Sequence, residues 1–376
     1  MIGKPNSGKS TFFASATLAD VEIASYPFTT IEPNVGIGFV RGRCPCSLLE
    51  EPCGKCVDGT RMVPMKMVDV AGLVPGAHEG RGLGNEFLSE AMQLDGLLHI
   101  VDLSGKSDEE GRAVPQHDPN QDVAFIKNEV EEWIVGLMLR DWSRIRKGSD
   151  PIEKISDRLS GIRIEQGEVK KALLDLGYDE KKSNTWDLRK MASKLLEFSK
   201  PILICANKCD LVGRKDFENF KTKVKNAMPT SAMCELALRR GASLGYIDYS
   251  PGGSSFKVIR EMTPKQRAGL DYIESFFETW INTGVQDAIE KMVYELLGMI
   301  AVYPVENENE FTDKDGNVLP DVFLVEKGTT AKGLAYKVHT DLGEKFIRAI
   351  DCKTGRVIGA DHELKDGDVI KIAAGR

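Results

Sequence analysis

Two apolar runs stand out along this chain: LLHIVDL at residues 97–103, and the start of PILICANKCD at residues 201–210. Runs without polar alternation are typical of strands that are buried on both faces of a parallel sheet. The shorter elements predicted beside them are strands at 35–40 and 62–70 and helices at 9–18 and about 85–95. Strands that alternate with helices predict an α/β fold with a mostly parallel sheet.

From residue 120 the pattern changes to a helical period. Apolar residues recur at steps of three and four, so one face of a long helix is apolar. These residues are Ile126, Val130, Trp133, Ile134, Leu137 and Met138. Further helices are predicted at 151–160, at 165–176 with Gly177 as a stop signal, and at 186–198. Because one crossover between parallel strands needs far fewer residues, we interpret residues 118–186 as a helical insertion in the α/β domain.

The last part of the chain has a different texture. Two helices, at about 264–281 and 285–298, lead into short predicted strands and one short helix after Thr330. The strands are predicted at 299–305, 318–325, 346–351 and 366–373. This pattern predicts a small α+β module. The expected organisation is a first part of the α/β domain at 1–117 with a cysteine-rich insertion at 43–57, the helical insertion at 118–186, the second part with linker helices at 187–298, and the small module at 299–376.

Composition narrows the class of protein. The 376 residues are enough for two or three domains with cores of their own. No apolar run reaches membrane-spanning length, and the N-terminus lacks the signature of a signal peptide, so we expect a cytoplasmic protein with no membrane partner. A net charge of −7 argues against a protein that coats nucleic acid, and DNA binding is not expected, although a local basic face could still touch RNA.

Residues 3–11, GKPNSGKST, match GxxxxGK[ST] without a gap, which is the pattern of a phosphate-binding loop. Gly3 and Gly8 allow backbone torsions through which N–H groups can turn toward a polyphosphate. Lys9 supplies a cation for the β and γ phosphates, and Ser10 a hydroxyl for Mg²⁺. A helix that begins near Lys9 adds its positive dipole end. The predicted nucleotide-binding residues here are Asn6, Ser7, Gly8, Lys9, Ser10 and Thr11.

A phosphate-binding loop normally follows a buried strand, yet only Met1 and Ile2 precede Gly3. Either a first strand of a few residues is missing, or the loop is weakly anchored. We favour the missing strand, which predicts a sheet with an unfilled slot at its centre.

Asp69-Val70-Ala71-Gly72 ends a predicted strand and offers a second contact to Mg²⁺ through Asp69. The N–H of Gly72 is free to meet a γ-phosphate. Thr30, in the loop ahead, is placed to reach Mg²⁺ only when that phosphate is present, which would make residues 24–33 a nucleotide-dependent switch. Thr29 is the competing candidate for this role.

NKCD, residues 207–210, follows a predicted buried strand. The carboxylate of Asp210 can accept two hydrogen bonds from the N1 and N2 donors of guanine, and adenine offers no such pair. At about 1.5–3 kcal/mol per hydrogen bond to a charged group, the pair gives a preference on the order of a hundredfold or more. Asn207 and Lys208 complete this box, and Ser231-Ala232 would present a backbone N–H to guanine O6.

Together these boxes resemble those of a translation-factor-type GTPase. DVAGLVPGAHEGRGLGNEFL, residues 69–88, resembles the signature of the Obg-like GTPases, and YPFTTIEPNVG, residues 26–36, that of the YchF branch, in its archaeal type. Residues 299–376 resemble a TGS domain, which has a ubiquitin-like fold. The resemblance implies hydrolysis of GTP to GDP and phosphate with Mg²⁺, and a role at the ribosome or its RNA through the helical insertion and the TGS-like module.

Two departures bear on this resemblance. YchF proteins are known for a changed base-recognition box and an ATP preference, whereas this chain keeps NKCD, so we choose GTP. Leu73 stands where many GTPases carry a water-orienting Gln, and an aliphatic side chain cannot align water. Related GTPases use an Asn at the position of Asn6 to hold K⁺ against the phosphates, which makes K⁺ a candidate cofactor. His78, which follows the DVAG box, is a second candidate for the catalytic arrangement, beside Lys9, Thr30 and Gly72.

Four of the eight cysteines, Cys44, Cys46, Cys53 and Cys56, lie close together in CPCSLLEEPCGKC. C-x-C followed by C-x₂-C can close a tetrahedral thiolate site, which suits Zn²⁺ or an iron–sulfur cluster. We interpret it as a structural metal site, with Zn²⁺ as the candidate ion.

The sequence therefore predicts a P-loop GTPase that acts as a nucleotide-dependent switch. An ATPase of the YchF type is the alternative within the same class. A binding module for RNA or protein, stabilised by its nucleotide and with little turnover, is the alternative from another class.

Overall fold

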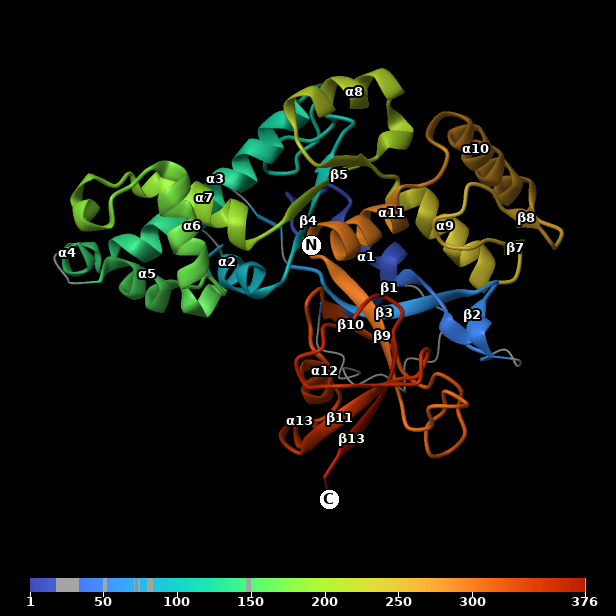
Figure 1. The fold of residues 1–376 in the computed structure, drawn as a ribbon. Helices are drawn as coiled ribbons and strands as arrows, with labels where there is room; N and C mark the ends of the chain where they lie inside the picture. The colour runs from blue at the N-terminus through green and yellow to red at the C-terminus, as the bar shows by residue number, and fades with distance from the viewer. Residues whose placement is uncertain are drawn as a thin grey trace. The chain divides into compact units, whose positions relative to one another are not determined.

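The computed structural model describes residues 1–17, 34–49, 53–70, 72–73, 75–79, 84–146 and 150–375. By their internal contacts the residues form two compact units, each assembled from two segments of the chain. One unit contains Met1–Leu18 and Val68–Ala288, and the other contains Ala19–Met67 and Ile289–Arg376 (Figure 1). Neither unit is therefore a single continuous stretch of sequence.

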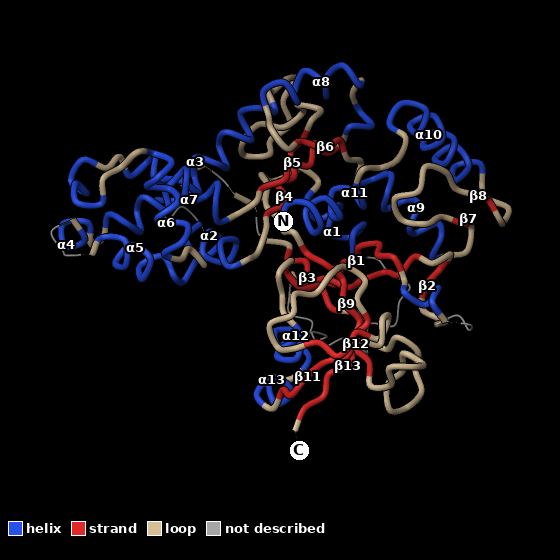
Figure 2. The backbone as a smooth tube through the Cα atoms, in the orientation of Figure 1, coloured by secondary structure: helices blue, strands red, loops and turns tan. Residues whose placement is uncertain are grey.

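The sheet of the first unit is built from the two apolar runs that dominate the sequence. β4 (Leu97–Asp102) pairs in parallel with β5 (Ile202–Asn207), and β5 pairs in parallel with β6 (Ala227–Pro229) (Figure 2). All residues of β4 are buried, as expected for a strand that is covered on both faces. The predicted parallel sheet is confirmed.

Met1 and Ile2 lie beside β4, where the first strand was expected. The N–H of Ile2 donates to Leu98 O at 2.9 Å, and the N–H of Ile100 donates to Ile2 O at 2.9 Å. On the other side, the N–H of Val70 donates to Met1 O at 3.3 Å. The prediction of an unfilled slot is wrong over these two residues, because their backbone groups bond to both neighbouring segments.

Helices pack around this sheet. α1 follows the phosphate-binding loop and packs against α9. The helices of this part are α1 (Lys9–Thr17), α2 (Gly84–Gln93), α8 (Arg214–Lys223), α9 (Ala232–Ser243), α10 (Pro264–Trp280) and α11 (Val285–Glu290). Two short strands, β7 (Ile247–Asp248) and β8 (Lys257–Val258), pair antiparallel. The sequence pattern predicted α1, α2 and α10, but not α8 and α9.

The segment between β4 and β5 is helical, as the periodicity predicted. Its helices are α3 (Pro119–Leu139), α4 (Trp142–Ile145), α5 (Pro151–Leu159), α6 (Gln166–Leu176) and α7 (Leu188–Ser199). Aspartates at 118, 150 and 187 cap α3, α5 and α7 by accepting backbone N–H groups, which explains where these helices begin. Gly177 ends α6 with φ +65°, the left-handed stop that its position predicted.

The second unit contains two sheets. Its first sheet has the order β1-β3-β2, from β1 (Val35–Arg43), β2 (Cys56–Val57) and β3 (Thr60–Val68). Its second has the order β10-β9-β13-β11-β12, with β13 parallel to β9 and the other pairs antiparallel. These strands are β9 (Met299–Val305), β10 (Phe323–Glu326), β11 (Phe346–Asp351), β12 (Arg356–Ile358) and β13 (Val369–Ala374). With α12 (Ala331–Val338) and α13 (Thr340–Glu344), they form the predicted α+β module.

Side-chain contacts join the two segments of this second unit. Arg41 of β1 makes a two-pronged ion pair with Glu290, with Nε 2.7 Å from Oε1 and a terminal nitrogen 2.8 Å from Oε2. Tyr294 donates its hydroxyl to Arg41 O at 2.9 Å. Arg61 of β3, which is only 2% exposed, donates to Leu319 O at 3.1 Å. The β1–β3 sheet is thus tied to the C-terminal segment by an ion pair and hydrogen bonds.

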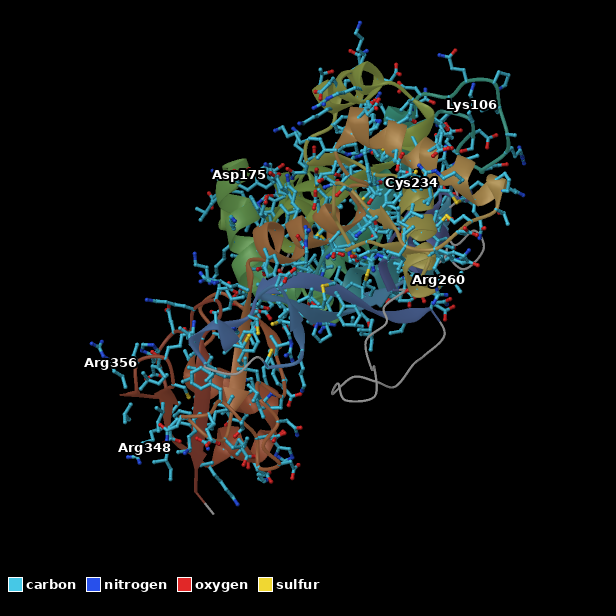
Figure 3. All side chains as sticks on the ribbon, turned by 90° about the vertical axis from the view of Figure 1, so that its right-hand side faces the viewer. Lys106, Asp175, Cys234, Arg260, Arg348 and Arg356 are labelled. Carbon is cyan, nitrogen blue, oxygen red and sulfur yellow. The ribbon has the colours of Figure 1, made fainter. Side chains whose placement is uncertain are left out.

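Two predicted elements differ from the structure. The helix expected at 285–298 is α11 followed by a π-helical turn at Lys291–Leu296, a change of pitch that apolar periodicity does not reveal. The strand expected at 318–325 begins only at Phe323, because Leu319 has φ +45°, outside the torsions of a strand. Charged side chains such as Arg348 and Arg356 extend from the last sheet into solvent (Figure 3).

Candidate nucleotide-binding site

The glycines of the phosphate-binding loop are required by close packing. Gly8 has φ +92°, and a Cβ there would lie 2.3 Å from Asn207 Nδ2. A Cβ on Gly3 would lie 2.6 Å from Ile100 O. Both distances are far below van der Waals contact, so a side chain at either position would displace the loop from the sheet.

Lys9, Ser10 and Asp69 lie together at the start of α1. Lys9 Nζ forms an ion pair with Asp69 Oδ1, and Ser10 Oγ is 3.3 Å from Asp69 Oδ2. The phosphate-binding cation and the two oxygen ligands predicted for Mg²⁺ therefore share one place in the structure. Oxygen donors of this kind are the ligands that Mg²⁺ prefers.

Asn207 joins two loops of the site. Its Nδ2 donates to Ser7 O at 3.0 Å, and its Oδ1 accepts the N–H of Ala232 at 3.0 Å. The residue is only 2% exposed, so both hydrogen bonds are shielded from water. The first residue of NKCD thus holds the phosphate-binding loop and the Ser231-Ala232 loop in one arrangement.

Lys208 makes a second connection, and one of its partners is Asp102, which was not among the predicted site residues. Lys208 has φ +62°, and its Nζ donates to Asn6 O at 2.7 Å and to Asp102 Oδ2 at 2.8 Å. Asp102, at the end of β4, also accepts a hydrogen bond from Ser107 Oγ at 2.8 Å. Although burial alone would raise it, the pKa of Asp102 is lowered by these bonds. The sequence did contain a signal for Asp102, because an aspartate at the end of a buried parallel strand lies at the edge of the sheet where ligands bind.

Asp210 lies in a short turn that α10 supports. Tyr272 of α10 donates its hydroxyl to Asp210 O at 2.9 Å and lies 3.5 Å from Asp210 Oδ2. Ser231 caps α9, with its hydroxyl 3.3 Å from Cys234 N, and its own N–H donates to Thr283 O at 2.8 Å. Hydrogen bonds therefore hold the predicted base-reading residues, from Tyr272 to Asp210 and from Ser231 to Thr283. The N–H of Ala232 donates to Asn207 Oδ1 in this arrangement.

The segment after the DVAG box is tied to both the phosphate-binding loop and α3. The N–H of Leu73 donates to Gly3 O at 3.2 Å, which brings Gly72 beside that loop. Further along, His78 Nδ1 is 2.7 Å from Glu129 Oε2 on α3. Burial would raise the pKa of Glu129, but hydrogen bonds from this segment lower it below its usual value. No sequence pattern singles out Glu129, since it is one of several acids on α3.

A buried ion pair lies behind the loop. Lys4 Nζ is 2.8 Å from Asp122 Oδ2, and both side chains are 1% exposed. His117 Nε2 is 2.8 Å from Asp122 Oδ1. Burial raises the pKa of Asp122, against the opposing influence of Lys4 and His117. The contact fixes the second residue of the phosphate-binding loop to the start of α3.

Asn6 lies in the described part of the phosphate-binding loop, whereas Thr30 does not belong to the described residues. Asn6 has φ +60° and donates its Nδ2 to Gly111 O at 2.8 Å, which leaves its amide oxygen as the atom available to a cation. Thr30, with the rest of the predicted switch at 24–33, lies outside the described residues, and so does Ala71 of the DVAG box.

The four clustered cysteines belong to the second unit. Their sulfur atoms all lie within 4.8 Å of one another, with Cys44 and Cys53 at 3.6 Å, Cys46 and Cys56 at 3.4 Å, and Cys53 and Cys56 at 3.6 Å. A tetrahedral Zn²⁺ with bonds of about 2.3 Å separates its sulfurs by about 3.8 Å, so the donor set fits that ion. Although burial opposes it, the pKa of Cys53 falls to about 7, because the N–H of Lys55 and neighbouring thiols stabilise the thiolate.

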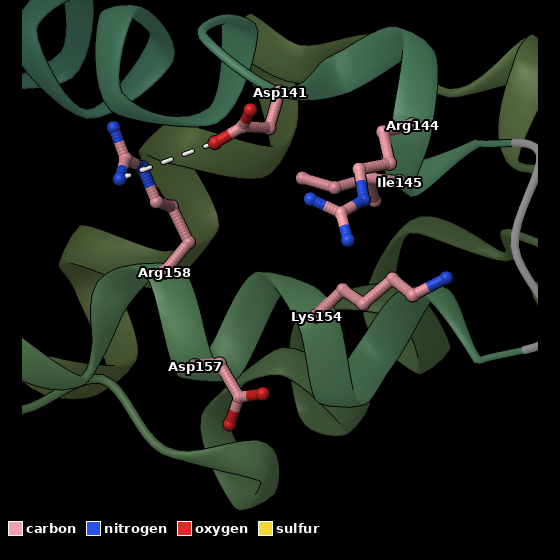
Figure 4. Close-up of a pocket in the computed structure, with 6 residues that line it drawn as sticks. All are labelled: Asp141, Arg144, Ile145, Lys154, Asp157 and Arg158. Carbon is pink, nitrogen blue, oxygen red and sulfur yellow. Dashed lines mark ion pairs between the residues drawn. The ribbon is translucent and has the colours of Figure 1, made fainter.

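A pocket outside this site lies on the helical segment. It has a volume of about 350 Å³ and lies between α4 and α5 (Figure 4). Its lining residues are Asp141, Arg144, Ile145, Lys154, Asp157 and Arg158. Arg158 is 4.0 Å from Asp141, and Arg144 and Lys154 add two more cations.

No helix in the described part of the chain is both long and apolar enough to cross a bilayer.

A glycine loop at the carboxyl edge of a parallel sheet, joined to DVAG and NKCD boxes, defines a P-loop protein of the GTPase class. Residues 1–135 match a family described as "50S ribosome-binding GTPase", residues 205–307 one described as "Obg-like GTPase YGR210-like, G4 motif-containing domain", and residues 310–374 the TGS domain. An uncharacterized GTP-binding protein of Methanocaldococcus jannaschii is 46% identical over 100% of this chain and 98% of its own length. The ribosome-binding ATPase YchF of Bacillus subtilis is 27% identical over 98% and 97% of the two chains.

A solved structure agrees with these sequence relatives. The crystal structure of a GTP binding protein from Pyrococcus horikoshii is similar with a TM-score of 0.77 and 33% identity, and the match covers 100% of this chain and 99% of that one. The chain belongs to the Obg-like GTPases, in the YchF group with a C-terminal TGS domain. The resemblance stated from the sequence is therefore confirmed.

Proposed function

We propose that this protein binds guanine nucleotides and hydrolyses GTP to GDP and phosphate with Mg²⁺, and that the two nucleotide states control its binding to a partner. The observation that carries this proposal is the pair of connections from NKCD to the phosphate-binding loop, Asn207 to Ser7 O and Lys208 to Asn6 O. They hold the predicted base box and the predicted phosphate site as one unit, which a chance match of short motifs would not require.

The phosphate side of the site would be served by Lys9 and the N–H groups of the loop. Ser10 and Asp69 would hold Mg²⁺, which neutralises charge on the β and γ phosphates when it is bound. We assign the γ-phosphate contact to Gly72. In the switch, we assign Thr30 to Mg²⁺, which it would contact only when the γ-phosphate is present. Asn6 is our proposed K⁺ ligand, through the amide oxygen that its bond to Gly111 leaves available. Exchange of Na⁺ for K⁺ should raise the turnover, and an unchanged rate would remove this role.

The base side rests on Asp210, flanked by Lys208 and the loop at Ser231 and Ala232. Two hydrogen bonds to its carboxylate, each worth about 1.5–3 kcal/mol, favour guanine over adenine by on the order of a hundredfold or more. Calorimetric titration with GTP, GDP and ATP in the presence of Mg²⁺ tests this. The Asp210→Asn variant should lose the preference, whereas Asp157→Asn, an exposed aspartate on α5, should keep it.

Equal or tighter binding of ATP by the unaltered protein would favour a second candidate, an ATPase of the YchF type. The relative from Bacillus subtilis that is named as an ATPase supports keeping this candidate. Binding of nucleotide without multiple turnover would instead favour a binding module whose nucleotide is structural, which the aliphatic Leu73 would explain.

We propose the ribosome or its RNA as the partner, in the cytoplasm. The support is the description of the family that matches residues 1–135 and the name of the Bacillus relative. The helical insertion at 118–186 and the TGS-like module at 299–376 are the proposed contacts. Arg144 and Lys154, which line the pocket in Figure 4, provide cations for phosphate oxygens. Cosedimentation with ribosomes should be stronger with a non-hydrolysable GTP analogue than with GDP.

We further propose that Cys44, Cys46, Cys53 and Cys56 bind a structural Zn²⁺. The supporting observations are four sulfur donors within 4.8 Å and separations close to those of a tetrahedral site. Protein purified without added metal should contain one zinc per chain. Cys53→Ser should lose it, and Cys352→Ser, a cysteine outside the cluster, should retain it. Absence of both zinc and iron would discard the site.

A further inference from the structure

Glu129 is a buried carboxylate whose hydrogen bonds, among the residues that the structure describes, come from the segment after the DVAG box. Its Oε1 accepts the N–H of Gly76 at 2.9 Å, and its Oε2 accepts the N–H of His78 at 2.9 Å. His78 Nδ1 lies 2.7 Å from the same Oε2. The residue is 6% exposed. Three donors from one short turn, 51 to 53 positions away in the sequence, converge on this side chain.

The helix that carries Glu129 makes it a fixed anchor. Its neighbours on α3, Ile126 and Val130, are each 1% exposed, and α3 packs against α5 and α7. A carboxylate on a packed helix holds its direction without help from solvent. The turn at Ala77–Glu79 is therefore oriented from the helical segment and not by its own sequence.

The contact also decides which nitrogen of His78 is available. A carboxylate only accepts hydrogen bonds, so Nδ1 carries the proton and donates it to Glu129. Nε2 is left with a lone pair that can accept a hydrogen bond from water. It is 3.9 Å from Glu79 Oε1, which is beyond hydrogen-bond range, and the His78 side chain is 29% exposed.

His78 is also on the segment that meets the phosphate-binding loop. The N–H of Leu73 donates to Gly3 O, and the aliphatic side chain of Leu73, 1% exposed, offers nothing to a water molecule. Among the described residues from 72 to 79, the polar side chains are those of His78 and Glu79. Glu79 is 73% exposed and carries a negative charge that would repel the triphosphate.

We propose that Glu129 is a positioning residue for hydrolysis: it fixes the tautomer and the direction of His78, whose Nε2 orients the water that attacks the γ-phosphate. This inference rests on the proposed GTPase function. In the step, the water oxygen bonds to the γ-phosphorus, the bond from that phosphorus to the β–γ bridging oxygen breaks, and the electron pair leaves with GDP. The water proton passes through Nε2 to solvent or to the phosphate product.

The test is single-turnover hydrolysis of GTP by the full chain at saturating GTP and Mg²⁺. Glu129→Gln should lower the rate about 10- to 100-fold, up to the lower end of the roughly 10²- to 10⁴-fold range for a group that transfers the proton itself, because Glu129 acts only through His78. His78→Ala should lower it at least as much, and the double variant should be no slower than His78→Ala, because Glu129 acts through the imidazole. The affinities for GTP and GDP should stay within about twofold.

Glu131→Gln is the matched control. Glu131 lies on the same helix, is equally 6% exposed, and faces Lys127 at 3.5 Å instead of the turn. Its rate should stay near that of the unaltered protein. Glu129→Asp is a second probe, because the shorter side chain keeps the charge but moves the carboxylate oxygens away from the turn. Its rate should lie between those of the unaltered protein and Glu129→Gln.

Several results would overturn the proposal. They are an unchanged rate in Glu129→Gln, an equal fall in Glu131→Gln, or a double variant slowed by the product of the two single effects. Loss of nucleotide affinity in parallel with rate would assign Glu129 a purely structural role. An undiminished rate in His78→Ala, in a protein that does hydrolyse GTP, would reject this inference alone. Absence of guanine preference or turnover in the unaltered protein would reject the proposed function and with it this inference.

Discussion

Replacement of Asn207 by alanine tests whether the base box and the phosphate loop act as one unit. The side chain donates to Ser7 O and accepts from Ala232 N, each at 3.0 Å, at a position that is 2% exposed. Alanine would leave the carbonyl of Ser7 and the N–H of Ala232 without these hydrogen bonds at a buried position. At about 1–3 kcal/mol for each unsatisfied group, the cost is roughly 2–6 kcal/mol. Even the lower value corresponds to a loss of about 30-fold in nucleotide affinity.

Titration calorimetry of GDP into the full chain measures this loss. Asn219→Ala, an exposed asparagine on α8, is the control and should bind as the unaltered protein does. Asn207→Asp keeps the shape and the bond from Ala232 but turns an acceptor toward Ser7 O, and should bind at least as weakly as Asn207→Ala. GDP affinity within threefold of the unaltered protein in Asn207→Ala would refute the reasoning.

Three further predictions concern single contacts. Tyr272→Phe removes the hydroxyl that donates a hydrogen bond to Asp210 O. Because one hydrogen bond is lost, GDP affinity should fall about 2- to 10-fold, while ADP affinity should not change. An equal fall in GDP affinity in Tyr336→Phe would contradict this. Lys200 has its pKa lowered to about 8 by burial, so the folded state binds fewer protons than the unfolded state above pH 8. The unfolding free energy should therefore rise by on the order of 3 kcal/mol between about pH 8 and 10.5, and urea titrations of Lys200→Met should lack this rise. Gly284 has φ +72°, and a Cβ there would lie 2.0 Å from a backbone oxygen. Gly284→Ala should therefore lower the melting temperature by at least about 3 °C. An unchanged melting temperature would show that the backbone around Gly284 can move to make room for the methyl group.

The sequence predicted those parts of the molecule that local patterns control. The period of three and four along α3 and the stop at Gly177 were sufficient for two helices, because each helix buries one face and ends at a left-handed residue. The cysteine spacing was also sufficient to predict that the four sulfur atoms lie together, since four cysteines between residues 44 and 56 have little room to separate. Metal binding by them stays a prediction. In both cases the informative residues are neighbours in the chain.

The missed parts depend on contacts between distant residues. Asp102 and Lys208 are 106 positions apart, and Glu129 and His78 are 51 apart. Each of these residues is of an ordinary type in its local sequence, and only the fold gives it a partner. The π-helical turn at Lys291–Leu296 was missed for another reason, because its change of pitch leaves no mark in the apolar pattern.

The assembly of the second unit from two distant segments has a consequence for how the protein is made. On the ribosome, β1 emerges before the whole of Val68–Ala288, and Glu290 and Tyr294, the partners of its Arg41, follow only afterwards. Until then Arg41 lacks both the Glu290 carboxylate and the Tyr294 hydroxyl, and an incompletely assembled unit of this kind is a condition under which nascent chains aggregate. Synthesis of this chain should therefore depend on chaperones more than its size suggests, up to the moment when the last segment leaves the exit tunnel.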